Sequence, residues 1–588
     1  MNNMKLDQSK QLPHKFPRPV EAWFTWLTII GIVVNASGLL LPILEPDGAL
    51  YATLSKNMVL RGDYMNLFVD GKDWLDKPHF PFWITAFSFK LFGFNSFAYK
   101  LPALLFWLAG AWYTYALAKK LYNKQTAQWG LLIYLSVEHL IISNNDVRAE
   151  PYLTGLMIGT AYYYYQAYTS NKWKYFIAGS LLLAFAVMTK GIFIVCMVMA
   201  GFVIDWVIKK QWKQFLNYRW WVSMVLVLLF IMPELISLYT QFDRHPEKLV
   251  FGQTNVSGIR FFFWDSQFGR FFNTGPIKGT GDKFFYVHTM IWAFLPWSVI
   301  LFVLIGSCMK NYKTIISPAG NYICSGIALS GFLVFSVSSF QLPHYLNILF
   351  PFFAIIVAAW LLNLKNNALV KTIIYSQNTL YYLLFAACIA LAFIVGVPYK
   401  IAATIVLAFL AFIMLRVFPG NGLPHILARS FGVIMAVNLF LNTLFYPVLF
   451  KYQSGKVAAD YVNSEQHEPV YLFNDISPEY AFQFYCNEPT YKIDTRDLDT
   501  MKTGIMVYTS QEKADSLEHM GYRLQIIQRF PHFHISQLTG KFLNEKTREN
   551  AIDQFVIATM QPGLLASITN ITAPFCASDK GGVLHRPR

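Results

Sequence analysis

Residues 374–397 read IYSQNTLYYLLFAACIALAFIVGV, a stretch without a single charged side chain. A helix needs roughly 17–25 mostly apolar residues to cross a bilayer, so this stretch predicts a transmembrane helix. The whole chain of 588 residues is 55% hydrophobic and 14% charged, whereas soluble domains carry roughly 25% charged residues. This composition excludes a disordered chain and an ordinary soluble enzyme, and it predicts a polytopic α-helical membrane protein.

Apolar segments of spanning length recur along the first 450 residues, and we count about thirteen of them. Their ranges are 22–44, 97–118, 125–143, 150–169, 174–189, 191–208, 219–241, 284–308, 318–336, 343–363, 374–397, 400–418 and 424–450. Residues 79–93 form a further apolar piece of about half that length.

The basic residues predict which side of the membrane each connection faces. The net charge is +15, from 48 Lys and Arg against 33 Asp and Glu. The N-terminus and then every second connection are rich in Lys and Arg, as cytoplasmic loops are. This distribution explains the charge without a nucleic-acid partner. It places the N-terminus in the cytoplasm, and an odd number of spans places the C-terminal segment outside.

Three regions are therefore expected on the non-cytoplasmic side: the loops 45–79 and 242–283, and the segment 451–588. We divide the chain into a transmembrane domain, 1–450, and a small α/β domain, 451–588. The second domain has strand-like runs at 469–473, 504–508 and 522–527, and its last twenty or so residues predict a poorly structured tail. Its Cys486 and Cys576 could pair in an oxidising compartment, a question that the sequence leaves open.

The first outer loop contains the candidate catalytic acid, Asp47. Asp is a common N-cap residue, and Leu50, Leu54 and Met58 follow at helical spacing, which predicts a short amphipathic helix on the outer membrane surface. The positive end of the helix dipole favours an ionised carboxylate there, as a catalytic base or metal ligand requires. The alternative is that Asp47 only caps the helix.

Further charges lie at the mouths of the outward loops. Lys77, beside Asp76, is either a phosphate-binding lysine at the lipid interface or a lysine that snorkels to it. The turn 143–152 contains Asp146, Arg148 and Glu150. Charges at this depth usually face a cavity or one another, and the alternative to a functional role is local pairing of Arg148 with Glu150 or Asp146. Asp146 and Glu150 are four residues apart and would share a helix face.

In this topology Lys190 lies between two apolar spans at their outer ends. It is therefore not one of the lysines that cytoplasmic loops collect. It either snorkels to the outer interface or provides a second cation for an anionic lipid headgroup.

Together these residues resemble the polyprenyl-phosphate-dependent membrane glycosyltransferases, in particular the aminoarabinose transferase of lipid A and the protein O-mannosyltransferases. The resemblance covers most of the membrane region. Its marks are Pro46-Asp47 with Tyr51-Ala52, Asp76-Lys77-Pro78, Arg148-x-Glu150-Pro151, Thr189-Lys190-Gly191, Leu295-Pro296-Trp297 and Gln341-Leu342-Pro343-His344-Tyr345.

The resemblance implies a GT-C-type fold and an inverting transfer of a hexosyl or pentosyl group. The donor would be an undecaprenyl-phosphate-linked or other polyprenyl-phosphate-linked sugar. The acceptor, on lipid A, another glycan or a protein, would be at the outer face of the inner membrane. It also implies roles for individual residues: Asp47 as the catalytic carboxylate, Glu150 as a second acid, Asp76 and Lys77 as an acid–lysine pair, Arg270 as the basic residue of the long outer loop, and Tyr345 near the donor phosphate.

This sequence departs from the aminoarabinose transferases at two places. They have a second acid directly after the first-loop Asp, where this chain has Gly48. They also have a metal-ligand histidine in the fourth outer loop, whereas the matching stretch, 279–286, has none. Both departures argue against assuming the same sugar, acceptor or metal site.

The chemistry of such a transfer can be argued from the residues themselves. A departing phosphate needs cations where negative charge grows, and the outward candidates are Lys77, Arg148, Arg270 and Lys190. An acceptor hydroxyl needs a base such as Asp47 on the opposite face of the sugar. A carboxylate such as Asp76 could also hold a divalent metal cation against the phosphate.

Three other classes of protein remain as alternatives: a flippase or transporter of lipid-linked sugars, an O-antigen ligase or polymerase, and a non-catalytic assembly subunit. A transporter would normally show buried charges within several spans or an internal repeat. The charges here gather at outer loop mouths instead, which favours an enzyme.

Overall fold

The computed structural model describes residues 19–310, 321–465, 469–473, 479–498 and 505–561. The described chain forms two compact units. The first runs to Phe450 and also includes Ile535–Arg548, and the second contains Lys451–His534 and resumes at Glu549. The predicted tail of the last twenty or so residues, Cys576 and the basic residues before position 19 lie outside the described residues.

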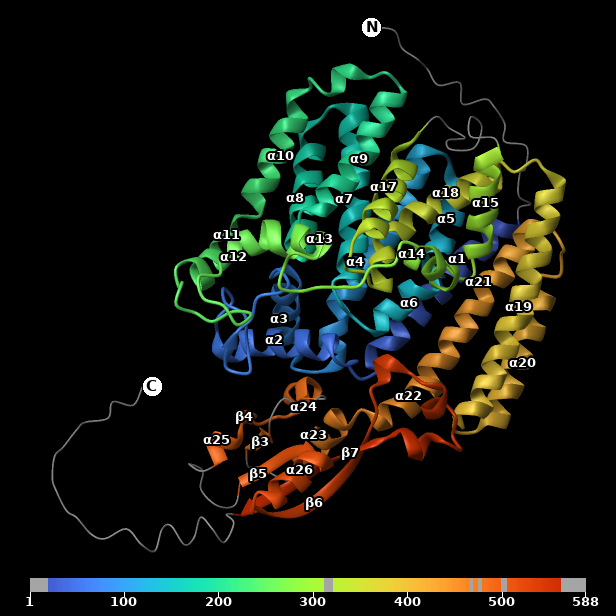
Figure 1. The fold of residues 1–588 in the computed structure, drawn as a ribbon. Helices are drawn as coiled ribbons and strands as arrows, with labels where there is room; N and C mark the ends of the chain where they lie inside the picture. Colours follow the sequence, from blue (N-terminus) through green and yellow to red (C-terminus); the bar gives the residue numbers. More distant parts are fainter. Residues whose placement is uncertain (1–18, 311–320, 466–468, 474–478, 499–504, 562–588) are drawn as a thin grey trace, which may run out of the picture. The chain divides into compact units, whose positions relative to one another are not determined.

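The first unit consists of helices and one short hairpin (Figure 1). Its α-helices up to the middle of the chain are α1 (Pro19–Ala36), α2 (Asp47–Arg61), α3 (Phe80–Phe92), α4 (Ser96–Leu121), α5 (Lys124–Leu135), α6 (Glu138–Asn145), α7 (Glu150–Ser170), α8 (Trp173–Lys190), α9 (Phe193–Ile208), α10 (Tyr218–Phe230) and α11 (Met232–Leu238). The later ones are α12 (Gly258–Arg260), α13 (Arg270–Phe272), α14 (Phe285–Ala293), α15 (Ser298–Lys310), α17 (Ile323–Val337), α18 (Phe350–Leu362), α19 (Asn367–Val395), α20 (Lys400–Val417), α21 (Leu423–Phe440), α22 (Tyr446–Leu449) and α27 (Gly540–Leu543).

Shorter elements connect these helices. The 3-10 and π segments are η1 (Ser37–Leu40), η2 (Trp212–Gln214), η3 (Tyr239–Asp243), η4 (Phe261–Gly269), η5 (Pro343–Leu349), η6 (Leu441–Phe445), η7 (Phe450–Tyr452), η8 (Ile535–Gln537) and η9 (Arg548–Ala551). Strands β1 (Phe68–Val69) and β2 (Lys72–Asp73) form an antiparallel hairpin between α2 and α3.

The protein is a multi-pass membrane protein. Six helices among the described residues are long and apolar enough to cross a bilayer: Ala22–Leu40, Ser96–Leu121, Pro343–Leu362, Asn367–Val395, Lys400–Val417 and Leu423–Tyr452. The bent pair Tyr218–Phe230 and Met232–Asp243 would make a seventh span, and four further apolar helices are shorter. Each of the thirteen predicted segments contains one of these helices or another helix of the first unit, but several are broken. The segment 125–143, for example, divides into α5 and α6.

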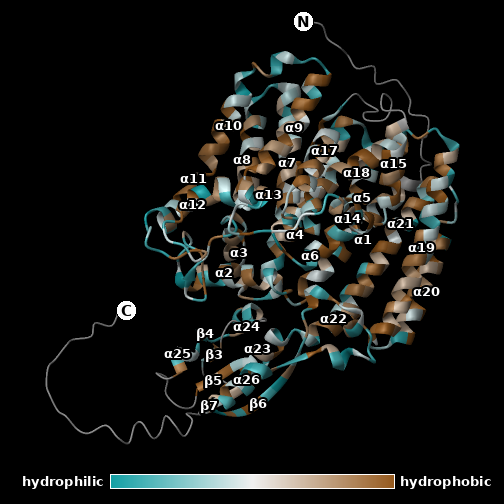
Figure 2. Ribbon diagram, in the orientation of Figure 1, coloured by the Kyte–Doolittle hydropathy of each residue, from teal (hydrophilic) through white to brown (hydrophobic). Residues whose placement is uncertain are grey.

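Two groups of helices lie on either side of α5, α17 and α18 (Figure 1). Helices α7, α8, α9 and α10 lie side by side, and α19, α20 and α21 form another group. Apolar residues cover the outer faces of α19 and α20 (Figure 2), where side chains such as Leu383, Ile405 and Phe409 are exposed. An apolar surface of this extent on long helices is typical of contact with lipid.

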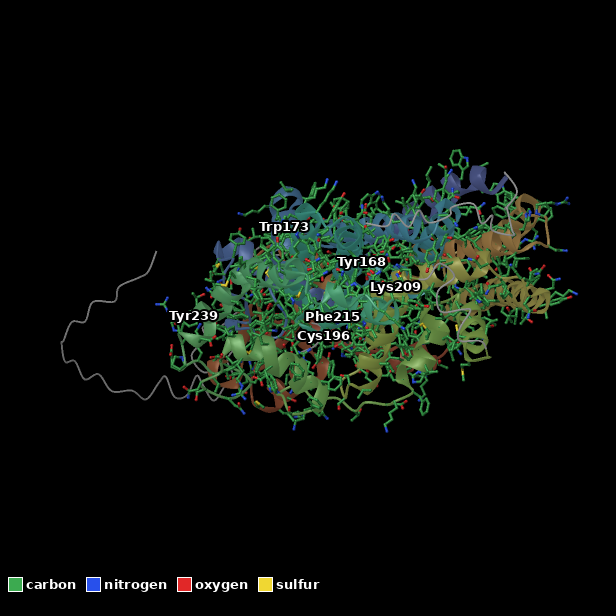
Figure 3. All side chains as sticks on the ribbon, turned by 90° about the horizontal axis from the view of Figure 1, so that it is seen from above. Tyr168, Trp173, Cys196, Lys209, Phe215 and Tyr239 are labelled. Carbon is green, nitrogen blue, oxygen red and sulfur yellow. The ribbon has the colours of Figure 1, made fainter. Side chains whose placement is uncertain are left out.

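A buried polar contact ties α7 to α9 at one end of the first group. Asp205, fully buried on α9, forms an ion pair with Lys209 at 2.8 Å and accepts a hydrogen bond from the Tyr168 hydroxyl at 3.3 Å. Figure 3 shows the Tyr168 and Lys209 side chains at this end. Asp205 Oδ1 also accepts from the backbone nitrogen of Tyr322, so one carboxylate fixes three segments.

The second unit contains a five-stranded mixed sheet with the strand order β4-β3-β5-β7-β6. The strands are β3 (Val470–Phe473), β4 (Tyr491–Ile493), β5 (Ile505–Ser510), β6 (Arg523–His532) and β7 (Asp553–Gln561), and the helices are α23 (Ser454–Glu465), α24 (Glu479–Tyr485), α25 (Thr495–Leu498) and α26 (Gln511–His519). β3 pairs in parallel with β4 and β5, whereas β7 is antiparallel to β5 and β6.

Three of these strands lie where the sequence predicts strands, namely β3, β5 and β6. The strands β4 and β7 were not predicted. β7 occupies a place inside the sheet, with Val556, Ile557 and Ala558 fully buried.

Candidate active site

Asp47 is the first residue of α2. Pro46, rather than Asp47, occupies the N-cap position, and no side-chain hydrogen bond caps the helix. The prediction that Asp47 is an N-cap is therefore wrong. Its Oδ2 instead accepts a hydrogen bond from Arg148 Nη1 at 2.5 Å. The acid still lies in the first turn, where the helix dipole favours negative charge.

Arg148 lies in the turn between α6 and α7 and joins two carboxylates. Its Nε donates to Asp146 Oδ2 at 3.1 Å while its Nη1 donates to Asp47. Asp146 follows the end of α6 whereas Glu150 begins α7, so the two acids do not share a helix face as their spacing predicts. A planar guanidinium bonded to both aspartates fixes Asp47 relative to this turn.

Asp76 and Lys77 follow the β1–β2 hairpin. The hairpin turn is Asp70-Gly71, and both residues have positive φ, at 55° and 70°. Two-residue turns of this type favour Asp-Gly, because both central residues must adopt φ > 0. The hairpin returns the chain to α3, with Asp76 and Lys77 in the connection.

The carboxylate of Asp76 binds two cationic side chains. Its Oδ2 lies 2.9 Å from Lys77 Nζ, and its Oδ1 accepts a hydrogen bond from Arg270 Nη2. Burial raises the pKa of Asp76, but the opposing effects of Lys77 and Arg270 are together stronger, and the pKa is lowered from its usual value. Arg270 follows the π-helix η4 directly, and its buried Nε has no acceptor among the described residues.

Glu150 and Lys190 form a third ion pair. Lys190 Nζ donates to Glu150 Oε1 and lies 3.7 Å from the centre of the Tyr345 ring, a cation–π distance. His344 Nε2 lies 3.8 Å from the same Glu150 oxygen. Tyr345 and His344 belong to the 3-10 helix η5.

All eight predicted site residues line one cavity of about 140 Å³. They are Asp47, Asp76, Lys77, Arg148, Glu150, Lys190, Arg270 and Tyr345. They come from six separate parts of the chain, so the structure brings together residues that are far apart in the sequence. The roles that we assign to them stay predictions.

A second cavity, mainly apolar and about 90 Å³ in volume, adjoins the first. The two share a wall that consists of Asp76, Lys77, Lys190, Arg270, Phe340 and Tyr345. Beyond this wall the lining is largely apolar and includes Phe193, Ile194, Met197, Phe271 and Phe335. A charged cavity thus opens beside an apolar groove, with lysine and arginine side chains at the boundary.

Sequence reasoning did not assign a role to two residues that line the polar cavity, Tyr51 and His344. Both belong to the motifs quoted above, and Tyr51 lies one helical turn after Asp47 on α2. Burial raises the pKa of Tyr51 well above its usual value, and Asp47 adds to the effect. The Tyr51 hydroxyl therefore stays neutral and is able to donate a hydrogen bond.

The side chains present do not fit a divalent cation held by the protein alone. Such ions bind several oxygen ligands, mainly carboxylates. No group of three or more His, Cys, Asp or Glu side chains in the described ranges could hold a metal ion. Each oxygen of Asp76 already contacts a cationic group. We therefore derive no step through a metal, and the metal role of Asp76 stays a prediction.

Residues 76–236 match the model of the dolichyl-phosphate-mannose-protein mannosyltransferase family. The chain is thus similar to this family over these residues. It is 26% identical over 357 residues to the undecaprenyl phosphate-α-4-amino-4-deoxy-L-arabinose arabinosyl transferase of Edwardsiella ictaluri, a match that covers 59% of the chain and 61% of the relative. An uncharacterized protein of Aquifex aeolicus is 26% identical over 373 residues, which cover 61% of the chain and 66% of that protein. The matches thus span less than two thirds of the length of either relative.

A solved structure has the same fold. ArnT from Cupriavidus metallidurans, in a crystal structure bound to undecaprenyl phosphate, aligns with 91% of this chain and 98% of its own at a TM-score of 0.71 and 16% identity. Its apo form gives the same TM-score. The chain therefore has an ArnT-like fold.

Proposed function

We propose that this protein is an integral-membrane glycosyltransferase that moves a sugar from a polyprenyl-phosphate carrier to an acceptor hydroxyl, with inversion. One observation carries the proposal: Lys77 and Arg270 lie at the boundary between a charged cavity and an apolar groove. A polyprenyl phosphate has the same two parts, an anionic headgroup and an apolar chain. The relatives named for undecaprenyl-phosphate sugars support this assignment.

The cations at the boundary suit a phosphate oxygen. Asp76 holds Lys77 and Arg270 together, so that both approach one point without rearrangement. Arg270 Nε is a buried donor without an acceptor among the described residues, and leaving such a donor unsatisfied costs about 1–3 kcal/mol. A phosphate oxygen would relieve this cost. Lys190, on the face of Tyr345, would provide a further positive charge.

In the proposed step the acceptor oxygen attacks the anomeric carbon from the face opposite the phosphate. The bond between this carbon and the phosphate oxygen breaks, and its electron pair stays on that oxygen. The carrier phosphate thus changes from a monoanionic diester to a dianionic monoester, and Lys77 and Arg270 stabilise the added charge. Asp47 accepts the acceptor's proton, a contribution of roughly 10²–10⁴ in rate.

The contacts favour narrower roles for two predicted site residues. Arg148 is bonded to Asp47 and Asp146, so it orients the base more directly than it could bind phosphate. Glu150 has a side chain only 2% exposed and is paired with Lys190, which favours holding this lysine over accepting a proton. The metal role predicted for Asp76 is tested by chelation, because transfer that persists in excess EDTA contradicts it.

We also propose that all thirteen apolar segments contribute spans and that the cavity opens on the non-cytoplasmic side of the inner membrane. The alternating basic loops support this orientation. The acceptor would then be at the outer face, on lipid A, another glycan or a protein. Mass spectrometry of envelope lipids and glycoproteins from a deletion strain identifies which of these acceptors loses a sugar.

The substitution Asp47→Asn tests the mechanism. The amide keeps the size of the side chain but takes no proton, so we expect transfer to fall by about 10²–10⁴, while binding of undecaprenyl phosphate to the purified protein stays close to the wild-type value. Asp63→Asn is the matched control, because Asp63 lies on the same outer loop but outside the cavity.

Near-normal transfer by the Asp47→Asn variant would place the base elsewhere, and Glu150 would be the next candidate. Loss of lipid-linked sugar translocation without any transferase chemistry would instead favour a flippase.

A further inference from the structure

Each of the three carboxylates that line the polar cavity contacts a lysine or arginine side chain. Asp76 has Lys77 on one oxygen and Arg270 on the other. Glu150 is paired with Lys190, and its side chain is only 2% exposed. Asp47 is bonded to Arg148 and, in the proposed mechanism, must remain able to accept a proton. Asp146 contacts Arg148 but does not line the cavity.

Four cationic side chains line the same cavity, namely Lys77, Arg148, Lys190 and Arg270. An ammonium group on a bound sugar would therefore meet an excess of like charges, and each carboxylate of the cavity already has a cationic partner. Like charges in a partly buried site repel by on the order of several kcal/mol before relaxation. A hydroxyl at the same position has no such cost.

The remaining lining contains no carboxylate. It consists of the Tyr51 and Tyr345 rings, His344, Ala149, Ile277, Phe340 and Leu342. Phenol hydroxyls can donate to or accept from sugar hydroxyls, and aromatic rings pack against the apolar faces of sugar rings.

The residue after Asp47 is a glycine, and the structure leaves little room there for an acidic side chain. Gly48 is buried on α2, and a Cβ there would lie 3.2 Å from Ile43 Cγ2 and 3.7 Å from Asp146 Oδ1. A longer acidic side chain would meet the Ile43 methyl group and the Asp146 carboxylate, which would repel it.

We infer that the donor sugar of this enzyme carries no positively charged amino group: the cavity takes a neutral sugar, with hydroxyl or acylated substituents. This inference rests on the proposed function, and it separates the chain from the relatives whose names specify 4-amino-4-deoxy-L-arabinose.

The test compares two donors that differ in a single group, undecaprenyl phosphate linked to arabinose and to 4-amino-4-deoxyarabinose. Binding of each is measured at neutral pH to the full-length wild-type protein without acceptor, so that all three cavity carboxylates are present, and bare undecaprenyl phosphate is the reference. We expect the arabinose donor to bind at least about tenfold tighter than its amino counterpart. Equal or tighter binding of the amino donor, with the carrier itself bound, would overturn the inference.

A second variant tests the cause of the preference. Lys190→Met removes the lysine partner of Glu150 and leaves a carboxylate for an ammonium group. The preference for arabinose should then fall toward parity or reverse, whereas Lys72→Met, an exposed lysine outside the cavity, should leave it unchanged.

An unaltered preference in the Lys190→Met variant contradicts the inference as argued. Failure of bare undecaprenyl phosphate to bind contradicts the proposed function itself, so the two failures are distinguishable.

Discussion

Lys77 and Arg270 share one carboxylate, and this arrangement gives each cation a measurable role. Lys77→Ala leaves the Asp76–Arg270 pair in place but removes one charge-assisted contact to a phosphate, worth about 1.5–3 kcal/mol. We expect undecaprenyl phosphate to bind on the order of 10–100-fold more weakly to the purified variant. Lys72→Ala, an exposed lysine on the hairpin, is the control. Unchanged carrier affinity in the Lys77→Ala variant would mean that this lysine only snorkels.

Many residues of the candidate site could be predicted from the sequence, because charged side chains are few in such an apolar chain. Only local partners could be predicted: the structure confirms Asp76 beside Lys77, and Asp146 as a partner of Arg148. Distant partners could not be predicted. Arg148 also bonds to Asp47, which is 101 positions earlier, and Arg270 bonds to Asp76, which is 194 positions earlier. Spacing arguments extend only to residues three or four apart, and the helix face that they predicted Asp146 and Glu150 to share does not exist. These partners require the fold.

The junction of α8 and α9 shows how an element positions a site residue. Gly191 has a φ of 112°, and a Cβ at this position would overlap the side-chain amide of Gln267, which donates to the Lys190 carbonyl. Gly191→Ala should therefore destabilise the protein by roughly 1–3 kcal/mol and displace Lys190 from Glu150. The measurements are the thermal unfolding midpoint and carrier affinity.

Gly306 on α15 is the matched control for this substitution, because a Cβ there meets nothing within 4 Å. Gly306→Ala should be neutral or slightly stabilising in a helix. Equal effects of the two substitutions would mean that the backbone at residue 191 does not require glycine.

The sequence predicts which segments contain helices, but it does not predict where a helix is interrupted within a segment. A run of apolar residues indicates only that the segment can be buried in lipid. The segment 284–308 is uniformly apolar, yet it forms α14 and α15 with a break between them. Strand β7 was missed for a related reason: consecutive buried residues such as Val556, Ile557 and Ala558 lack the alternation that identifies a half-exposed strand.

At the scale of the whole molecule, the second unit has a pH sensitivity of its own. His532 is buried, its Nδ1 lies 3.0 Å from Ser454 Oγ, and burial lowers its pKa to about 4. An unfolded histidine titrates near pH 6.5, so between these two values the unfolded state binds more protons. The unit should lose up to roughly 3 kcal/mol of stability as the pH falls from about 6.5 to about 4.

Hydrogen exchange of β6 and β7 amides in the full-length protein, corrected for intrinsic rates, measures this loss. The neutral substitution His532→Gln should remove the pH dependence, and His519→Gln, at an exposed position of α26, should keep it. A His532→Gln protein with the wild-type pH profile would assign the effect to another group.

The orientation of the whole chain decides whether the cavity can reach an acceptor at the outer face. Thirteen crossings from a cytoplasmic N-terminus place Gly455, in the first turn of α23, on the non-cytoplasmic side. An alkaline phosphatase fusion after Gly455 should therefore be active, and one after Asn171, beside the basic residues Lys172 and Lys174, should be inactive. A fusion after Gly62 should be active, because it lies on the loop with Asp47 and Lys77.

Activity after Gly62 with inactivity after Gly455 would mean an even number of crossings. The second unit would then face the cytoplasm while the cavity kept its predicted side. Inactivity after Gly62 would place the cavity itself in the cytoplasm, where the donor and acceptor of the proposed reaction would have to be sought.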